Sequence, residues 1–247
     1  MKQTVLVTGG TGFIGSHTTV ELQQAGYDVV IVDNLSNSNA DVVDGIEKIT
    51  GIRPAFEKVD CLDKDALEGV FKKYPIKAVI LRYFNPIGAH PSAIIGELPN
   101  GVPANLIPYI TQTAIGIRPQ LSVFGNDYNT PDGTCIRDFI YVVDLAKAHV
   151  CAMARILDGK SEDSVEIFNI GTGSGVSVQQ LIDTFEKCTG VKLNYKVVGR
   201  RAGDIEKIWG NVDKANNVLG WKAVHTLEDA LSSAWKWQLH LREAGIM

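Results

Sequence analysis

Apolar and polar residues fall along the chain in blocks that predict strands and helices in regular succession. Residues 5–7 form a continuous apolar run typical of a buried strand, and residues 16–26 have the spacing of a short amphipathic helix ending at Gly26. A second buried strand is predicted over residues 28–32. Apolar strands that alternate with helices are typical of a parallel sheet covered on both faces. The N-terminal part therefore predicts a doubly wound α/β fold.

The alternation continues along the next part of the chain. A helix is predicted over about residues 40–50, a strand over residues 54–59, a helix over residues 63–74 and a strand over residues 77–80. The last strand runs on without a polar break into the apolar segment 81–88, which ends in a Pro/Gly loop.

The pattern becomes irregular after residue 88. A polar, proline-punctuated stretch reaches about residue 105, and segments of this length in compact domains are usually functional loops. Shorter elements follow: helices over about 105–116, 143–157 and 177–189, strands over 121–125, 135–142, 165–170 and 193–197, and two helices after residue 213. These elements predict a smaller α/β lobe over residues 89–247, with segments at about 117–150 and 165–175 returning to the larger domain.

The first strand runs directly into a glycine-rich turn. Gly9, Gly12 and Gly15 allow a tight turn, close approach of the backbone to a phosphate and close packing of the following helix. The N–H groups at the start of that helix then point at an anion. Glycine clusters are also common in ordinary turns, but here the flanking strand and helix favour a dinucleotide site, so residues 1–88 predict a Rossmann portion.

Asp33 ends the second predicted strand, about twenty residues beyond the glycines. A carboxylate there accepts hydrogen bonds from the adenosine ribose and repels a 2′-phosphate. The sequence therefore favours NAD over NADP.

Composition and charge exclude several function classes. Of the 247 residues 45% are hydrophobic, and the formal charge of -4 comes without a basic stripe, so nucleic-acid and anionic-membrane binding have no electrostatic support. Cys61, Cys135, Cys151 and Cys188 show no metal or redox spacing, so we expect reduced thiols and no metal. We expect a cytoplasmic protein, because no apolar run has the length of a leader or a membrane span.

Longer motifs give the chain a specific resemblance. They are VLVTGGTGFIGSH (5–17), VDNLSNS (32–38), LRYFNPIGAHPS (81–92), NLIPYITQ (105–112), FGNDYNTPDGTCIRDFIYVVDLA (124–146), RRAGD (200–204) and DKA…LGW (213–221). With these blocks the chain resembles the UDP-glucose (UDP-galactose) 4-epimerases of the extended short-chain dehydrogenase/reductase superfamily. The resemblance implies a cytoplasmic NAD-dependent isomerase of galactose metabolism, which interconverts UDP-glucose and UDP-galactose through a 4-keto intermediate, and a homodimer.

The resemblance also implies the residues that bind each ligand. For NAD they are Gly9, Gly12, Phe13, Ile14, Gly15, Asp33, Asn34, Leu35, Ser36, Asn37, Ser38, Asp60, Cys61 and Phe84. For the UDP-sugar they are Asn85, Asn105, Leu106, Ser122, Val123, Phe124, Arg137, Arg201 and Asp204. Two arginines suit one pyrophosphate, because planar guanidinium groups bind phosphate oxygens bidentately. Without the resemblance, Asn85 before Pro86 is equally consistent with a turn, Phe84 and Phe124 with the core, and the arginines with solvated surface charges.

The family's catalytic Tyr-x-x-x-Lys block has no counterpart in the chain. Ile80 matches the family's fourth strand and Leu81 its sixth, and none of the seven tyrosines has a lysine four residues later. A tyrosine without such a lysine keeps a pKa near 10 and is a poor base at neutral pH. We therefore predict an internal deletion and no catalytic residue in this chain.

The missing block implies exposed surface as well as lost activity. The apolar strands at 5–7 and 78–81 are predicted to have an uncovered face, and the helices of the dimer contact are predicted to be absent. We therefore expect poor solubility or altered association. Two alternatives remain: a related UDP-sugar dehydratase or decarboxylase, and a non-catalytic protein that binds NAD or UDP-sugars.

Overall fold

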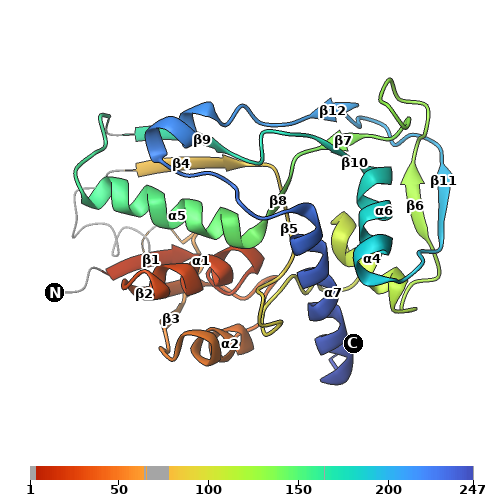
Figure 1. The fold of residues 1–247 in the computed structure, drawn as a ribbon. Coiled ribbons are helices and arrows are strands. Elements are labelled where there is room, and N and C mark those ends of the chain that lie inside the picture. Colours follow the sequence, from red (N-terminus) through yellow and green to blue (C-terminus); the bar gives the residue numbers. More distant parts are fainter. Residues whose placement is uncertain (1–3, 64, 66–77, 164, 247) are drawn as a thin grey trace.

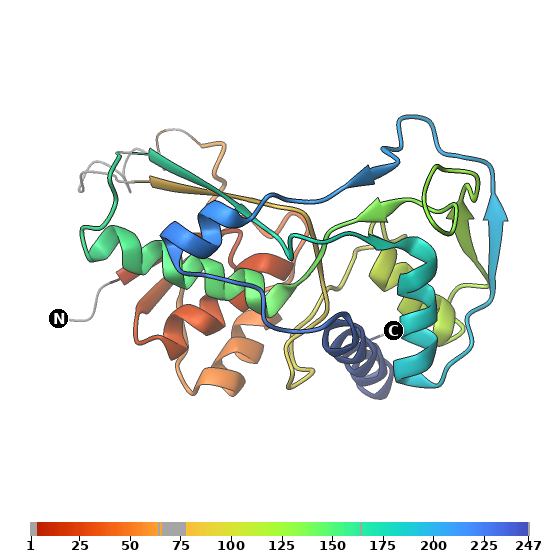
Figure 2. The same cartoon turned by 45° about the horizontal axis from the view of Figure 1, so that its top comes forward.

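The computed structural model describes residues 4–63, 65, 78–163 and 165–246. Figure 1 shows two neighbouring parts, with β1 to β3 in one and β6 and β11 at the far end of the other. The two parts are also separate in Figure 2, where long segments from the middle of the chain connect them. The predicted helix over residues 63–74 lies almost wholly outside the described residues.

The N-terminal part contains the predicted strand–helix alternation. Parallel strands β1 (Thr4–Thr8), β2 (Asp28–Asp33) and β3 (Ala55–Lys58) form one sheet in that order, with α1 (Phe13–Gln24) and α2 (Asp41–Thr50) between them. Val5 and Val7 are buried with the apolar side chains of β2 and α2, so that face of β1 is covered. Val20 and Leu22 of α1 belong to the same buried cluster. The uncovered face predicted for this strand can then only be the opposite one, which carries the half-buried Leu6.

The strand that crosses the predicted deletion pairs away from this sheet. β4 (Ala78–Tyr83) lies parallel to β9 (Val165–Ile170), with Ile80 opposite Ile167. Among the described residues neither β4 nor β1 has a strand on its other side. The predicted α/β fold with parallel strands is confirmed, and the sheet is divided between β1 and β4.

The two faces of the β4–β9 pair differ in burial. On one face Leu81, Phe168 and Ile170 pack against α5 (Val142–Leu157) and the short helix η1 (Ala215–Leu219). On the other face Ile80, Val165 and Ile167 are exposed by 45%, 49% and 40%. This is the uncovered apolar face that the sequence predicts for residues 78–81.

The second part is built from short strands and three helices. β6 (Leu121–Phe124) pairs with β11 (Tyr195–Val198), and β7 (Ile136–Arg137) lies between β10 (Val176–Ser177) and β12 (Lys207–Ile208). β5 (Asn85–Ile87) and β8 (Phe139–Tyr141) pair at the junction of the two parts. The helices are α4 (Leu106–Ala114), α6 (Val178–Thr189) and α7 (Leu227–Glu243). The single strand predicted over 135–142 is therefore two strands, which are separated at Asp138.

α6 and α7 each begin at a reciprocal pair of capping hydrogen bonds. Ser177 accepts a hydrogen bond from the Gln180 N–H, and the Gln180 side chain accepts one from the Ser177 N–H. Thr226 and Asp229 make the same reciprocal pair at the start of α7. Among the helices of the described residues none is both long enough and apolar enough to span a bilayer.

Candidate functional site

The glycine turn between β1 and α1 is as tight as its sequence predicts. Gly9 has φ +65, its N–H donates to the Val32 carbonyl across 2.8 Å, and the Gly12 N–H donates back to the Gly9 carbonyl. A Cβ atom on Gly15 would lie 2.1 Å from the Gly9 oxygen, so only glycine fits there. Gly12 caps α1 without a side-chain acceptor, which leaves the first helical N–H groups available to an anion.

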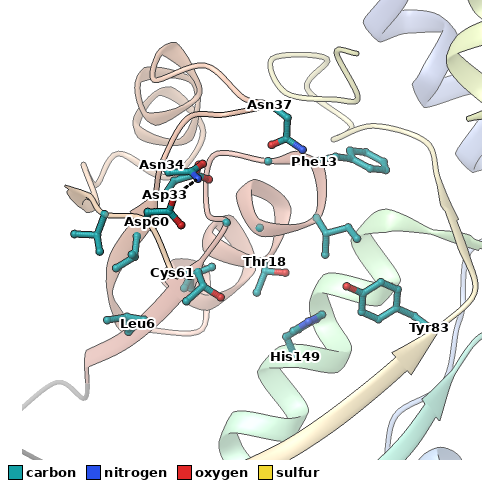
Figure 3. A pocket seen from close by; sticks show the side chains of 18 residues that line it. Leu6, Phe13, Thr18, Asp33, Asn34, Asn37, Asp60, Cys61, Tyr83 and His149 are labelled. Carbon is teal, nitrogen blue, oxygen red and sulfur yellow. Dashed lines mark hydrogen bonds between the residues drawn. The ribbon is translucent and has the colours of Figure 1, made fainter. Parts of the chain in front are cut away.

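A cavity of about 580 Å³ opens beside this turn (Figure 3). It lies between the end of β1, the start of α1, the end of β2 and the segment after β3, with Tyr83 and His149 on its opposite side. Ten of the residues predicted for NAD line it: Gly9, Gly12, Phe13, Ile14, Gly15, Asp33, Asn34, Asn37, Asp60 and Cys61. The fold thus brings most of the predicted cofactor residues to one cavity.

Asp33 is the buried carboxylate of this cavity. Its Oδ1 accepts hydrogen bonds from the Leu35 N–H at 2.8 Å and the Ser38 hydroxyl at 3.2 Å, and its Oδ2 accepts one from the Thr11 N–H at 3.2 Å. Burial opposes ionisation, but these hydrogen bonds outweigh it and lower the pKa of Asp33 below its usual value. A carboxylate has roughly four acceptor positions, so Asp33 retains capacity for one more hydroxyl donor.

Some of the predicted residues after β2 line the cavity, and others lie outside it. The Asn34 amide donates to Asp60 at 3.2 Å, which together with the Leu62 N–H keeps the pKa of Asp60 low. Leu35, Ser36 and Ser38 are outside the residues that line the cavity. Leu35 has φ 62, an unusual conformation for a leucine. In this conformation its N–H donates the hydrogen bond to Asp33.

Phe84 also lies outside the cavity lining. Its ring lies against Gly171 and Gly210, where added Cβ atoms would come within 3.1 Å and 2.5 Å of it. Successive side chains of an extended segment point to opposite sides, so Tyr83, not Phe84, faces the cavity. The nicotinamide role of Phe84 stays a prediction.

Tyr83 and His149 are cavity residues that the sequence analysis missed. Their ring centroids lie 6.3 Å apart, and the Nδ1 of His149 lies 2.9 Å from the Leu145 carbonyl. A carbonyl can only accept, so Nδ1 carries the hydrogen and Nε2 is the free acceptor. Burial lowers the pKa of His149, which keeps the ring neutral at pH 7. The sequence signal for Tyr83 was its position next to Phe84 in an extended segment, where neighbouring side chains point to opposite sides. His149 had no sequence signal.

Three of the residues predicted for the UDP-sugar form a charged cluster. Asp204 Oδ1 lies 2.9 Å from an Arg201 nitrogen and 3.5 Å from an Arg137 nitrogen. The Arg201 guanidinium also lies over the Phe124 ring, 5.2 Å from its centroid. Residues from β7, the β11–β12 connection and β6 thus meet, and two guanidinium groups share one carboxylate. A pyrophosphate offers these groups more acceptor oxygens than Asp204 does.

The remaining predicted substrate residues are more scattered. Asn105 precedes α4 and donates to Glu97 at 2.6 Å, and burial raises the pKa of that glutamate. Leu106 packs on the core of the second part, and Val123 is buried there, so only the backbone of Val123 can contact a ligand. Ser122 is half-buried in β6, and Asn85 is exposed with its N–H donating to the Asp138 carbonyl.

Asp138 connects the two parts and was also missed. This fully buried carboxylate accepts hydrogen bonds from the N–H groups of Thr172, Gly173 and Gly210 and from the Thr172 hydroxyl, at 2.8 to 3.2 Å. It therefore holds the loops after β9 and β12 beside the Arg137 strand. In the part of the chain that the structure describes, no cluster of three or more His, Cys, Asp or Glu residues could hold a metal ion.

A family comparison locates a break in the chain. The family described as "NAD dependent epimerase/dehydratase family" matches residues 5–80 and 72–171 in two separate pieces. The two matched ranges overlap over residues 72–80, so the overlap ends at Ile80, where the sequence predicts the junction with Leu81.

Individual relatives show the same break as a difference in length. A UDP-glucose 4-epimerase of Dictyostelium discoideum is 36% identical over 329 residues, covering 95% of each chain, and one of Bacillus subtilis is 36% identical with similar coverage. The chain has 247 residues, so at least 82 aligned positions, the difference between those two lengths, face no residue of it. Because these positions lie inside the aligned span, they are internal to the relative.

Solved structures are similar over almost the whole chain. A UDP-glucose-4-epimerase from Stenotrophomonas maltophila with bound NAD and formylated UDP-arabinopyranose has a TM-score of 0.92 and 35% identity, covering 99% of this chain and all of that one. A UDP-glucose 4-epimerase from Bifidobacterium longum in complex with NAD+ and UDP has a TM-score of 0.87 and 32% identity, with coverages of 96% and 98%. The predicted fold and family resemblance are confirmed.

Proposed function

This chain belongs to the NAD dependent epimerase/dehydratase family, and from that premise we propose that it binds NAD beside the glycine turn and a UDP-hexose at the arginine cluster. The proposed reaction class is that of its UDP-glucose 4-epimerase relatives, the interconversion of UDP-glucose and UDP-galactose in galactose metabolism. The relatives named as 4-epimerases favour this class over a dehydratase or decarboxylase.

The cavity beside the glycine turn carries the proposal. Its volume of about 580 Å³ lies within the range of cofactor sites. The backbone at Gly15 has no room for a side chain, which leaves the turn open to a phosphate. The lowered pKa of Asp33 keeps its carboxyl ionised at neutral pH, at the end of the cavity where we place the adenosine ribose. The residues present therefore suit a dinucleotide with an unmodified adenosine ribose. Cys61 and Asp60 border the same end, where we place the adenine.

Bound NAD would supply a hydride acceptor and donor for C4 of the hexose. This chain's own residues would do the remaining work of binding. The first N–H groups of α1 would hold the cofactor pyrophosphate, and Arg137 and Arg201 would hold the UDP pyrophosphate after Asp204 releases them to the ligand. Binding energy at the UDP would then orient a sugar that has few contacts of its own.

Within the described part of the chain, no residue replaces the missing Tyr-x-x-x-Lys base. Tyr83 is the described tyrosine that lines the cavity, and the ring beside it is the neutral His149 instead of a lysine ammonium. We therefore propose that the chain by itself binds both ligands without turnover. The chain by itself would then act as a non-catalytic protein that binds NAD and a UDP-sugar.

The test separates binding from turnover. Purified full-length chain is incubated with NAD and desalted, and the retained cofactor is measured by chromatography after denaturation. We expect retention by the wild type, at least tenfold less by Asp33→Asn, and wild-type retention by Asp158→Asn, which alters an exposed carboxylate at the end of α5.

Calorimetry with UDP and a UDP-galactose turnover assay complete the experiment. UDP binding with no turnover supports the proposal, whereas turnover well above background contradicts the absence of a base. Equal NAD retention by the wild type and Asp33→Asn contradicts the proposed cofactor site.

A further inference from the structure

Glu97 carries a half-buried carboxylate to which the proposed binding sites give no role. Among the ion pairs of the described residues none includes Glu97. Burial raises its pKa, and the hydrogen bond from Asn105 lowers it by a smaller amount. That bond runs from the Asn105 amide to Oε1 and is 2.6 Å long. A carboxylate removed from water without a cation destabilises a fold, so this polar contact indicates what Glu97 does.

The backbone at Glu97 is held in place by α7. The Trp237 indole N–H donates to the Glu97 carbonyl at 3.0 Å. A Cβ atom on the preceding Gly96 would lie 2.5 Å from the same indole ring, so the chain packs directly against it. Gly96 also forms an antiparallel bridge with Ala89. The Glu97 carboxylate is therefore attached to a fixed part of the chain.

Asn105 occupies the N-cap of α4 but does not cap it. Its backbone is extended, with φ -92 and ψ 150, and its side chain makes no capping hydrogen bond. An N-cap side chain normally accepts from the second or third N–H of the helix. Pro108 is the third helical residue and has no N–H. The Asn105 side chain turns instead to Glu97, eight positions earlier in the chain.

The carboxylate fixes which way the Asn105 amide faces. An ionised carboxylate accepts hydrogen bonds and cannot donate them, so the NH₂ group must face Glu97. The carbonyl Oδ1 and the second N–H of the amide remain for other partners, and no hydrogen bond within the described residues engages them. Asn105 is exposed, so a ligand can reach both groups. Without the carboxylate the amide can turn by 180° and exchange the positions of its oxygen and nitrogen.

We propose that Glu97 is a positioning residue of the UDP-sugar site, which holds the Asn105 amide with Oδ1 and one N–H free for the ligand. The inference rests on the proposed function, because it takes this ligand to be the UDP-sugar. Charge alone predicts the opposite effect, since removal of a negative charge favours the binding of an anion such as UDP. Weaker UDP binding after loss of Glu97 is therefore evidence for positioning.

The test measures UDP binding by calorimetry on the full-length chain. We expect Asn105→Ala and Glu97→Leu each to weaken binding by about three- to tenfold, the effect of one lost hydrogen bond. Glu97→Asp keeps the charge but is one methylene shorter, so it should weaken binding in the same way. Glu97→Gln keeps a carbonyl acceptor at the same reach and should stay within about twofold of the wild type. Glu243→Leu, at an exposed glutamate that ends α7, is the matched control and should bind like the wild type.

A double variant shows whether Glu97 acts through Asn105. If it does, Glu97→Leu has no further effect on UDP affinity in the Asn105→Ala background. An equal loss in both backgrounds overturns the proposal, because Glu97 would then act independently of the amide. Unchanged affinity in Asn105→Ala, or in both Glu97→Leu and Glu97→Asp, also overturns it. So does tighter binding by Glu97→Leu, because the charge would then dominate.

Melting curves of each variant show whether it has folded. If Glu97→Leu does not fold, the comparison of Glu97→Asp with Glu97→Gln decides: weaker binding by the first alone supports the proposal, and equal binding overturns it. Absence of UDP binding by the wild type is failure of the proposed function and overturns both. Wild-type binding that no Glu97 variant alters overturns this inference alone.

Discussion

The buried carboxylate of Asp138 accepts a hydrogen bond from the Gly210 N–H across 3.2 Å, although the two residues are 72 positions apart in the chain. The loop after β12 is thereby attached to the strand that carries Arg137. The two Thr172 donors and the Gly173 N–H bind the same carboxylate, so one side chain holds two loops beside the proposed substrate residues.

Removal of that carboxylate should destabilise the fold strongly. Asp138→Ala leaves several donors without an acceptor, and each unsatisfied buried group costs about 1–3 kcal/mol, so we expect a loss of about 3–5 kcal/mol in unfolding free energy. Urea denaturation measures the change, with the exposed Asp158→Ala as control. A change below about 1 kcal/mol would show that water or relaxation satisfies those donors.

The arginine cluster should bind UDP through both of its guanidinium groups. We expect Arg137→Lys and Arg201→Lys each to weaken UDP binding by about ten- to a hundredfold, because lysine cannot bind phosphate oxygens bidentately. Arg200→Lys is the matched control: Arg200 donates to Asp127 at 2.7 Å and stacks on Tyr128, so its ion-pair partner is Asp127 and not Asp204. Calorimetry on all three variants checks this, and an equal loss with Arg200→Lys would contradict the assignment.

His17 should make the fold sensitive to acid. It is buried in α1, Nδ1 lies 2.6 Å from the Phe13 carbonyl and Nε2 has no partner. Burial lowers its pKa to about 3, with a smaller raising effect of the Phe13 carbonyl and a lowering one of His90. The unfolded state, with a pKa near 6.5, therefore binds the proton first as pH falls, and stability should decrease by about 1.4 kcal/mol per pH unit below pH 6.

Unfolding free energies of the wild type and His17→Leu at pH 7, 6 and 5 measure this effect. The variant should lose less stability than the wild type between pH 6 and 5, whatever its stability at pH 7. Parallel pH profiles for the two proteins would show that His17 does not titrate on unfolding.

The exposed face of β4 and β9 should make the protein self-associate. We expect Ile80→Lys to increase solubility and to shift the sedimentation profile toward the monomer, because it places a charge among Val165 and Ile167. Ile246→Lys, at an isoleucine that is 55% exposed near the C-terminus, tests the effect of charge alone. A wild-type chain that sediments as a clean monomer at high concentration would contradict the prediction.

Much of the proposed nucleotide site was predictable from the sequence. The glycines at 9, 12 and 15 and the carboxylate at 33 belong to one contiguous strand–turn–helix–strand unit, whose hydrophobic periodicity and backbone requirements are local. The break at Ile80 and Leu81 was also evident in the sequence, because the motifs on its two sides match different strands of the family.

Only the tertiary structure decided which partners the later segments meet. The pairing of β4 with β9 instead of β1, the approach of Tyr83 and His149 to the cavity, and the attachment of Gly210 to Asp138 all join residues far apart in the chain. Such contacts depend on how helices and strands pack after they have formed, and no local pattern encodes them. The sequence determined the elements and their chemistry, and packing between distant segments determined the open edges beside the cavity.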